Sequence, residues 1–349
     1  MLCLKPSQKV TLNLLLVLGA LTSCVKAQGS DANKEYRLIS TVKSSSFERQ
    51  LNDAALQGFR VELLAQSVRI ASLTVLVARA ETAAKHEPTV EYKLIGFGDF
   101  KKQKDGLGKA GFRCRGALYP NALIGMVAAP FVLLERQLAV HLSAEFEIIE
   151  SKKESERQQK INAAAVQGFT PVSVTHAYTL LQRETNAMTS SLSSKDYRLV
   201  DTYKISTLEK EMNLIAKDGY CFVLSSALNT VIMAKEKQLT GSMQCEYKLA
   251  SLSESGKLMQ QVALLAKEQF RFQGVTQLGA AVIFERSINQ PRSGRSLEYK
   301  VLETFSEETM VKELSAATKS GFVPLSLGHG VKGFLSIFLY REAPVGPSN

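Results

Sequence analysis

Two short motifs in this chain combine residue types and spacings that do chemistry in other proteins. Ser40-Thr41-Val42-Lys43 has the Ser-x-x-Lys spacing that activates a serine nucleophile when one helical turn brings the amine beside the hydroxyl. Gly106-Leu107-Gly108-Lys109-Ala110-Gly111 is a formal GxGxxG, which binds dinucleotides between a strand and the helix after it. The surrounding pattern instead predicts a strand through Ser40 and a helix that ends near Gly111. Neither setting suits the chemistry, so we expect no site at either motif.

Side chains that bind metals are few and scattered. The histidines, which form no HxH or HxxxH pair, are His86, His141, His176 and His329. The five cysteines form no CxxC pair, so we expect no metal site and no cofactor. Cys114 and Cys221 fall in expected strands, where a cysteine is usually a buried apolar residue. A disulfide between Cys221 and Cys245 is the alternative if the chain enters an oxidising compartment.

The first residues have the pattern of an export signal. Lys5 and Lys9 precede an apolar stretch over 10–21. This stretch is too short to cross a membrane as a helix. Leu21-Thr22-Ser23-Cys24 follows directly and resembles a bacterial lipobox, in which a peptidase cleaves before a cysteine that carries lipid. The resemblance implies cleavage after Ser23 and lipidation of Cys24. We expect a signal peptide over 1–23 and a membrane anchor on the mature chain.

The residues after the lipobox bear on where the protein is located. Residues 24–34 are mostly polar and predict a tether between the anchor and the folded part. Val25 follows the modified cysteine. By resemblance to lipoproteins of two-membrane bacteria, a residue other than Asp there implies an outer-membrane protein of the cell envelope that faces the periplasm. Cleavage after Val25-Lys26-Ala27 is the alternative, and it releases a periplasmic or secreted protein.

The composition is that of a folded protein with a basic surface. The chain has 349 residues, of which 45% are hydrophobic and 22% charged, and a formal net charge of +10. These values exclude a disordered chain and a multi-span membrane protein. Residues 1–23 hold two Lys and no acid, so the mature chain keeps +8. Ordinary solubility is one interpretation, and attraction to lipid head groups or an anionic envelope polymer is another. Export argues against nucleic acid as a partner.

Two landmarks recur six times along the chain. An aromatic residue opens an apolar run at intervals of 56, 54, 51, 50 and 52 residues. These aromatics are Tyr36, Tyr92, Phe146, Tyr197, Tyr247 and Tyr299. A Gly-aromatic pair follows 22 residues later, or 19 residues later in the second copy. The landmark residues are Gly58, Gly111, Gly168, Gly219 and Gly321, with Gln269 in the fifth copy. Such self-similarity indicates six copies of one unit.

Between the two landmarks, the pattern predicts one helix in each copy. Apolar residues lie 11, 7, 4 and 3 positions before the glycine, as Phe47, Leu51, Ala54 and Ala55 do in the first copy. The glycine, and Gln269 at some cost, then takes a left-handed conformation. Two strand-like segments follow, so each unit is predicted to be β-α-β-β. The predicted units cover 35–80, 90–136, 145–184, 196–237, 245–286 and 298–342.

A unit of this size cannot bury its sheet by itself. We expect a pseudo-symmetric α+β repeat protein in which pairs of units form mixed sheets with helices on one side. The pattern leaves open a closed ring or an open row. If each helix buries the residue seven positions before the glycine, Leu51→Ala, Met212→Ala and Leu314→Ala each cost about 2–4 kcal/mol. Alanine at Glu48 or Lys210 is expected to be near neutral.

The unit resembles a family of small bacterial domains of unknown function. That family has a Tyr-Lys-Val-Val strand, a helix, and a hairpin that begins with Gly-Trp-Glu-Leu. The best-matching residues are Glu298-Tyr299-Lys300-Val301-Leu302 and Gly321-Phe322-Val323. The family has no known catalytic residues, so the resemblance implies none here.

The absence of a polar constellation shared by the copies predicts a protein without catalytic function. We expect an envelope lipoprotein that acts as a binding or structural scaffold through its six repeats. The expected partners are the membrane, through the lipid, and another envelope protein. One alternative is a basic surface that binds an anionic polymer or lipid head groups. The other is an enzyme whose site lies between repeats.

Overall fold

The structure is a computed structural model that describes most of the chain from Lys34 to Pro344. The described residues are 34–65, 72–80, 89–118, 122–123, 126–127, 130–140, 142–151, 153–175, 177–185, 195–202, 204–226, 230–237, 244–251, 255–276, 281–289, 295–329 and 335–344. The expected signal peptide, with Ser23, and the lipidation residue Cys24 lie outside them. No helix in the described part has the length and apolar character that a membrane crossing needs.

The elements recur in six groups, which we call units 1 to 6. Unit 1 holds β1(Lys34–Thr41), α1(Ser44–Leu56), β2(Arg60–Leu64) and β3(Leu73–Ala80); unit 2 holds β4(Val90–Gly96), α2(Phe97–Lys109), β5(Arg113–Leu118), β6(Ala122–Leu123), β7(Met126–Val127) and β8(Phe131–Gln137); unit 3 holds β9(Ala144–Glu150), α3(Glu154–Val166), β10(Thr170–Val174) and β11(Tyr178–Glu184). Unit 4 holds β12(Lys195–Asp201), α4(Ile205–Ala216), β13(Cys221–Ser225) and β14(Thr230–Glu236); unit 5 holds β15(Cys245–Ser251), α5(Ser255–Lys267), β16(Arg271–Thr276) and β17(Ala281–Ser287); unit 6 holds β18(Arg295–Thr304), α6(Glu307–Lys319), β19(Val323–His329) and β20(Leu335–Pro344). The predicted repeated α+β architecture is confirmed.

Each unit forms its own three-stranded antiparallel sheet. In unit 1 the order is β1-β3-β2, so the last strand lies between the first and the second. The prediction of mixed sheets shared by pairs of units is therefore wrong. The physical reason is that the parallel first and second strands are separated by an antiparallel one. A helix of the preceding unit covers the outer edge at which a neighbouring sheet would have to pair.

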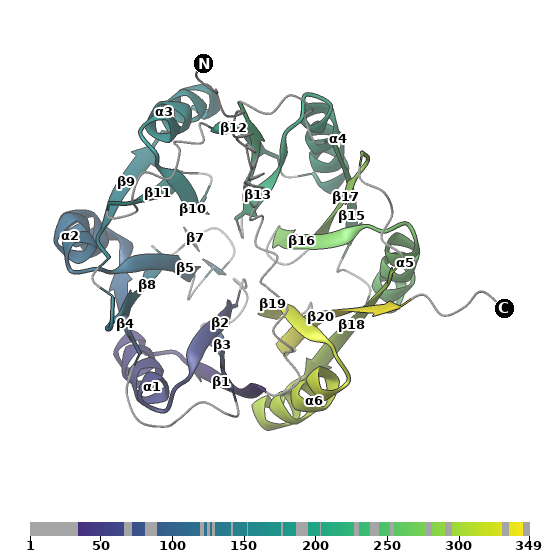
Figure 1. The fold of residues 1–349 in the computed structure, drawn as a ribbon, viewed down its shortest axis with the longest axis horizontal. Helices are drawn as coiled ribbons and strands as arrows, with labels where there is room; N and C mark the ends of the chain where they lie inside the picture. Colours follow the sequence, from purple (N-terminus) through teal and green to yellow (C-terminus); the bar gives the residue numbers. More distant parts are fainter. Residues whose placement is uncertain are drawn as a thin grey trace, which may run out of the picture.

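The six units form a closed ring, with the helices at the rim and the second strands toward the centre (Figure 1). Each helix packs between its own sheet and the first strand of the next unit, and α6 packs on β1 in the same way. Ala65 and Leu327 form a parallel bridge between units 1 and 6. These contacts decide between the ring and the open row.

The hydrophobic core is divided into six clusters, one at each junction between units. At the junction of units 1 and 2, Phe47 and Leu51 of α1 pack with Tyr92 of β4. At the closing junction, Leu314 of α6 packs with Tyr36 of β1. Five of the six opening aromatics are buried. The sixth, Tyr299, is partly buried and packs against the cluster at the junction of units 5 and 6. A helix therefore buries its apolar face against two units at once.

The glycine landmarks end the helices as predicted. Gly58, Gly111, Gly168, Gly219 and Gly321 have φ between +82° and +89°. Gln269, in the fifth unit, has φ of +65° and is the single described residue other than glycine with a positive φ. The left-handed residue lets the chain leave the helix and enter the second strand within three residues.

Candidate functional site

Three of the six aromatic landmarks satisfy a backbone group of the preceding unit. The residue three positions after the glycine landmark begins a β-bulge in each second strand. At three junctions the tyrosine hydroxyl of the next unit accepts a hydrogen bond from the backbone N–H of that residue. The pairs are Val61 N to Tyr92 Oη at 2.8 Å, Phe222 N to Tyr247 Oη at 2.7 Å and Phe272 N to Tyr299 Oη at 3.0 Å.

The other three junctions follow the same physical requirement. Phe146 has no hydroxyl, and Gln182 Oε1 accepts from Cys114 N at 2.7 Å instead. Proline stands at the bulge in units 3 and 6, as Pro171 and Pro324, and has no N–H to satisfy. The aromatic landmarks pack in the clusters at the junctions between units.

Helix side chains also bind the backbone of the next unit. Asn52 Nδ2 donates to Tyr92 O at 2.9 Å, and its Oδ1 accepts from Tyr92 N at 2.8 Å. Asn162 and Asn213 repeat this two-way contact with Tyr197 and Tyr247. We call this contact the amide clamp. It occupies the outer edge of the next first strand and so blocks edge-to-edge pairing there.

Glu48 belongs to the same set of contacts. Its Oε2 accepts a hydrogen bond from Leu94 N of unit 2 at 2.7 Å. Glu209 and Gln158 receive the same kind of bond from Leu249 N and Leu199 N. The expectation that alanine at Glu48 is near neutral assumed an exposed side chain, whereas Glu48 accepts a hydrogen bond from the next unit because the helix face there is partly polar.

In five of the six units, an arginine near the end of the last strand caps the helix of its own unit. In unit 1 the Arg79 guanidinium lies 4.7 Å from the Phe59 ring, donates to Gln57 O at 2.9 Å and pairs with Glu35 at 2.5 Å. Arg136, Arg183, Arg286 and Arg341 make the same three contacts in units 2, 3, 5 and 6. These five arginines are thus engaged in structural contacts.

The two sequence motifs that were set aside lie in structural positions. Ser40 is in β1, and its hydroxyl lies 2.9 Å from that of Thr74 on the paired strand. Gly106 and Gly108 are inside α2, ahead of β5, which is the reverse of a dinucleotide site. A Cβ on Gly108 would lie 2.0 Å from Ala144 O of unit 3, so this glycine permits close packing.

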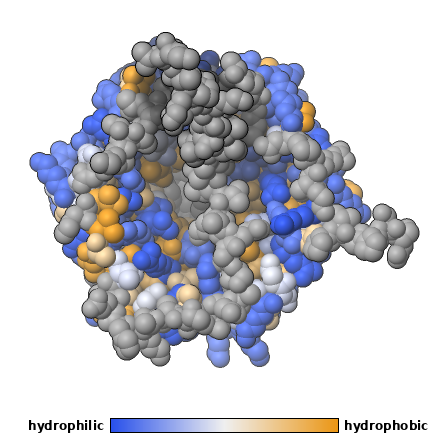
Figure 2. All heavy atoms as spheres, viewed as in Figure 1, coloured by the Kyte–Doolittle hydropathy of each residue, from blue (hydrophilic) through white to orange (hydrophobic). Residues whose placement is uncertain are grey.

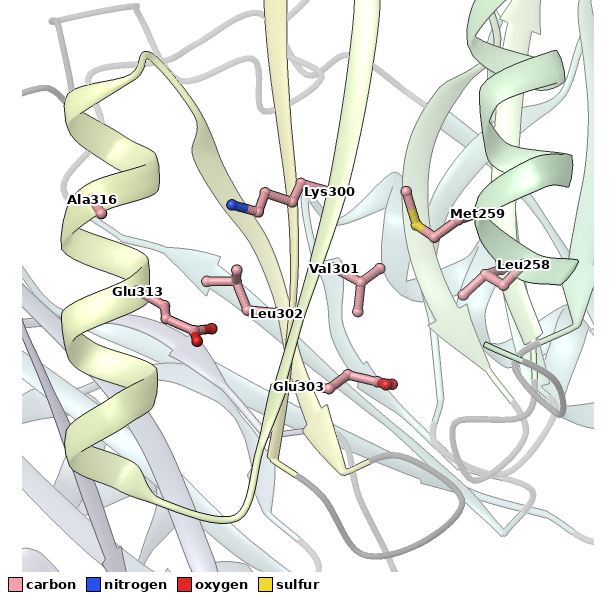
Figure 3. Close-up of a pocket in the computed structure, with 8 residues that line it drawn as sticks. All are labelled: Leu258, Met259, Lys300, Val301, Leu302, Glu303, Glu313 and Ala316. Carbon is pink, nitrogen blue, oxygen red and sulfur yellow. The ribbon is translucent and has the colours of Figure 1, made fainter. Parts of the chain in front are cut away.

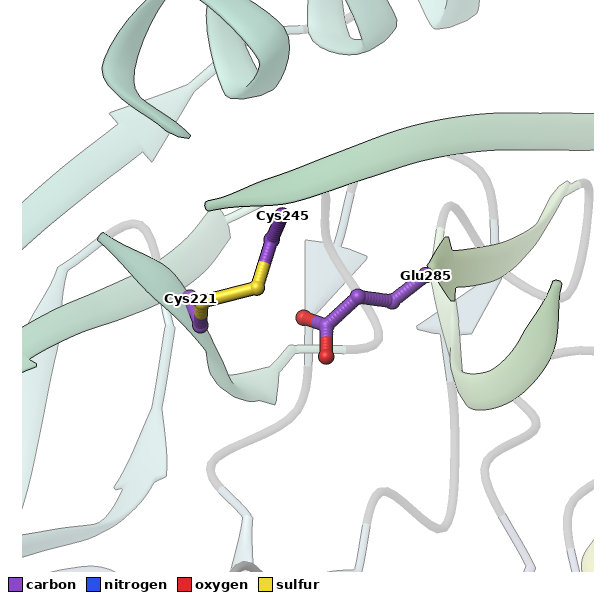
Figure 4. A group of neighbouring side chains, drawn as sticks. All are labelled: Cys221, Cys245 and Glu285. Atoms are coloured by element: carbon purple, nitrogen blue, oxygen red, sulfur yellow. A yellow bond between two sulfur atoms is a disulfide. The ribbon is translucent and has the colours of Figure 1, made fainter. Parts of the chain in front are cut away.

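One group of potential metal ligands lies close together among the described residues. Cys221 of β13 and Cys245 of β15 form a disulfide that joins units 4 and 5, with their Cα atoms 5.8 Å apart. Figure 4 shows the Glu285 side chain, from β17, extending toward the two sulfurs. The sulfur atoms and a carboxylate oxygen all lie within 4.8 Å of one another. With Tyr247 we call these residues the acid–disulfide cluster.

Hydrogen bonds hold the Glu285 carboxyl in this cluster. Its Oε2 accepts from Tyr247 Oη at 2.5 Å and from Phe222 N at 3.1 Å, and its Oε1 accepts from Gln273 Nε2 at 3.3 Å. Burial raises the pKa of Glu285 above its ordinary value, and the hydrogen bonds oppose that shift. Burial, with the nearby Glu285, also raises the pKa of Tyr247. The sequence analysis left the Cys221–Cys245 disulfide as an alternative to buried apolar cysteines, and it placed no acid beside them.

A groove lies at the rim where units 5 and 6 meet. It has a volume of about 670 Å³ and is lined by Met259 of α5, by Lys300, Val301 and Glu303 of β18, and by Glu313 of α6. Figure 3 shows Lys300 on the side of β18 that faces α6, and Met259 on the side toward α5. Met259 occupies the position that Glu48 has in α1, so α5 offers no carboxylate to β18 at that position. We call this hollow the rim groove.

A buried arginine interrupts the core at the junction of units 3 and 4. Arg157 of α3 is 1% exposed and stands where Phe47 stands in α1. It donates to Thr175 O at 2.7 Å and pairs with Asp201 at 3.1 Å. Sequence reasoning missed this residue, although a base in the apolar helix position was a visible signal. Both of its contacts are within the junction.

Hydrophilic side chains predominate over the helices at the rim (Figure 2). His329 is in β19, whereas His86, His141 and His176 lie outside the described residues.

Comparison of the chain with the profiles of known protein families, with curated proteins and with solved structures finds no match.

Proposed function

We propose that this chain is a non-enzymatic protein of the bacterial cell envelope that binds a partner through its ring of units. The observation that carries the proposal is the use of the repeated polar groups. The tyrosine hydroxyls, the amide clamps and the capping arginines are engaged in joining or ending elements. We interpret the units as six copies of a β-α-β-β module, and a ring of such modules is a rigid support for a binding surface.

Export to the envelope has two lines of support. The lipobox-like Leu21-Thr22-Ser23-Cys24 implies a lipid anchor, with the outer membrane as the expected location. The disulfide between units 4 and 5 is of the kind that forms and persists in oxidising compartments. A secreted or periplasmic protein is the alternative if cleavage occurs after Ala27.

The anchor is tested by fatty-acid labelling and detergent phase partition of the full chain. The wild type should incorporate labelled fatty acid and enter the detergent phase, because acyl chains contribute about 0.8 kcal/mol per buried CH₂. Cys24→Ser should do neither. Cys3→Ser is the matched control, since this cysteine lies in the expected signal peptide. An unlabelled wild type in the aqueous phase, with Gln28 at its N-terminus, contradicts the anchor.

The rim groove is the place at which we expect a protein partner to bind. A photo-activatable amino acid in place of Met259 should give a specific cross-linked product in intact cells. The same amino acid in place of Lys210, which is exposed on α4, is the control. Equal products from both positions, or none from position 259, contradict this part of the proposal.

A basic surface for an anionic envelope polymer is the second candidate function. The observation that favours it is the excess of 43 Lys and Arg over 33 Asp and Glu. Binding of lipopolysaccharide or anionic vesicles should then weaken as salt is raised, because surface charges are screened. Binding that is absent, or that is independent of salt, argues against it.

A further inference from the structure

The acid–disulfide cluster has the chemical make-up of a metal site that is closed by oxidation. Two sulfurs and a carboxylate oxygen lie within 4.8 Å of one another, on β13, β15 and β17. Thiolate and carboxylate are ligands of zinc, and three protein ligands with an open fourth position are a common zinc arrangement. As a disulfide, however, the sulfurs have no thiolate to offer.

We propose that reduction converts this cluster into a site for one zinc-like divalent cation, held by Cys221, Cys245 and Glu285. A dithiol supplies the reduction by thiol–disulfide exchange. The S–S bond between the two cysteines breaks, a new S–S bond forms in the donor, and the two donor protons pass to the cysteine sulfurs. The cation then displaces these protons and binds both thiolates and the carboxylate.

The surroundings of the Glu285 carboxylate point to a cation as its binding partner. In the described part of the chain, Glu285 forms no ion pair with a Lys or Arg, whereas Glu246, Glu298 and Glu342 all do. It is held instead by neutral donors, the Tyr247 hydroxyl and the Phe222 amide. Such donors orient a ligating carboxylate without cancelling its charge. Two soft sulfur ligands favour zinc or cobalt over magnesium or calcium.

The proposal is tested by cobalt titration of the full chain. The chain is reduced with a dithiol, the dithiol is removed without oxygen, and Co²⁺ is added. We expect a thiolate-to-cobalt absorption band that saturates at one equivalent and is removed by Zn²⁺. The oxidised chain should give no band. Absence of the band in the reduced wild type overturns the proposal.

Three variants assign the ligands. Cys221→Ser should remove the band, and Cys114→Ser, the matched control in unit 2, should keep it. Glu285→Gln should bind Co²⁺ at least tenfold more weakly and still form the disulfide when oxidised. An unchanged band in Cys221→Ser, or unchanged affinity in Glu285→Gln, contradicts the assignment.

A test without substitutions covers the case in which a variant fails to fold. In the reduced wild type, Zn²⁺ should slow alkylation of Cys221 and Cys245 at least tenfold, and a chelator should restore the rate. Peptide mapping distinguishes these two thiols from the other cysteines. Equal alkylation rates with and without Zn²⁺ would falsify the site.

Discussion

At the residue scale, the described structure is governed by the need to satisfy backbone groups at the bulges. Val61 and Cys114 present N–H groups at equivalent bulges, and they receive a tyrosine hydroxyl and a glutamine oxygen respectively. Pro171 presents none, and Tyr197 of the next unit does not serve as an acceptor there. An unpaired buried N–H costs about 1–3 kcal/mol. A substitution that removes the acceptor should therefore destabilise the protein only where the bulge residue has an N–H.

Tyr92→Phe should therefore destabilise the protein by about 1–3 kcal/mol, because Val61 N–H loses its acceptor. Tyr197→Phe should be nearly neutral, since Pro171 offers no N–H across that junction. The free energy of unfolding in urea measures both. Equal losses in the two variants contradict this account of the bulges.

Glu285 predicts a dependence of stability on pH. Burial raises its pKa in the folded state above the ordinary value of 4.5. The folded state therefore holds the Glu285 proton to higher pH than the unfolded state. The free energy of unfolding falls as pH rises from the ordinary pKa towards the raised pKa of the folded state. Glu285→Gln keeps the neutral form, so this variant should gain stability relative to the oxidised wild type as pH rises above 4.5. Glu303→Gln, at an exposed position, should follow the wild type.

At the scale of the elements, each helix must match two surfaces, its own sheet and the next first strand. Leu51, Met212 and Leu314 are 0% exposed and lie in junction clusters. Two of these helices, α1 and α4, also use Asn52 and Asn213 to bind the neighbouring strand. These side-chain contacts consequently set the distance between each helix and the first strand of the next unit.

Truncation of the buried helix residues tests the helical register. Leu51→Ala, Met212→Ala and Leu314→Ala should each lower the free energy of unfolding by about 2–4 kcal/mol. Lys210→Ala, on the exposed face of α4, should be within about 0.5 kcal/mol of the wild type. Glu48 is unsuitable as a control because it binds Leu94 N. Similar effects at Met212 and Lys210 would show that the register is wrong.

The two glycines of α2 should respond to alanine in opposite directions. Gly106→Ala should stabilise by about 0.5–1 kcal/mol, because a Cβ there meets no atom within 4 Å and alanine favours the helix. Gly108→Ala should destabilise by about 1–3 kcal/mol, because its Cβ would collide with Ala144 O. Thermal unfolding of both variants measures the difference. A stabilising Gly108→Ala contradicts the close approach of α2 to β9.

At the scale of the whole molecule, closure makes units 1 and 6 neighbours although they are the most distant in sequence. α6 covers β1, and Tyr36 and Leu76 share a cluster with Met310 and Leu314. Each unit therefore depends on two others, and an open row of repeats would leave the terminal units with one neighbour each.

Deletion of residues 295–344 tests this closure. The deletion removes α6, so we expect the amides of β1 to lose most of their protection from hydrogen exchange. The amides of β12, in the middle of the chain, should keep more of theirs. If the amides of β1 remain as protected as in the intact chain, the ring does not close in solution.

The sequence alone determined the local structure because local structure depends on near neighbours. Apolar spacing marked Phe47 and Leu51 as one helix face, and the recurring glycine marked the helix end, even where Gln269 replaces it. The aromatic landmarks marked the start of each first strand for the same reason.

Only the tertiary structure decided what depends on segments far apart in the chain. The pairing of first with last strands, ring closure and the placement of Glu285 beside Cys221 and Cys245 all join residues from separate elements, and ring closure joins the two ends of the described chain. Edge covering by helices excluded the mixed sheets, and no local pattern carries that information. The amide clamp was visible as an asparagine six positions before three of the glycines, but its partner strand was not. A pattern predicts an element from its own residues, whereas a junction exists only once two elements meet.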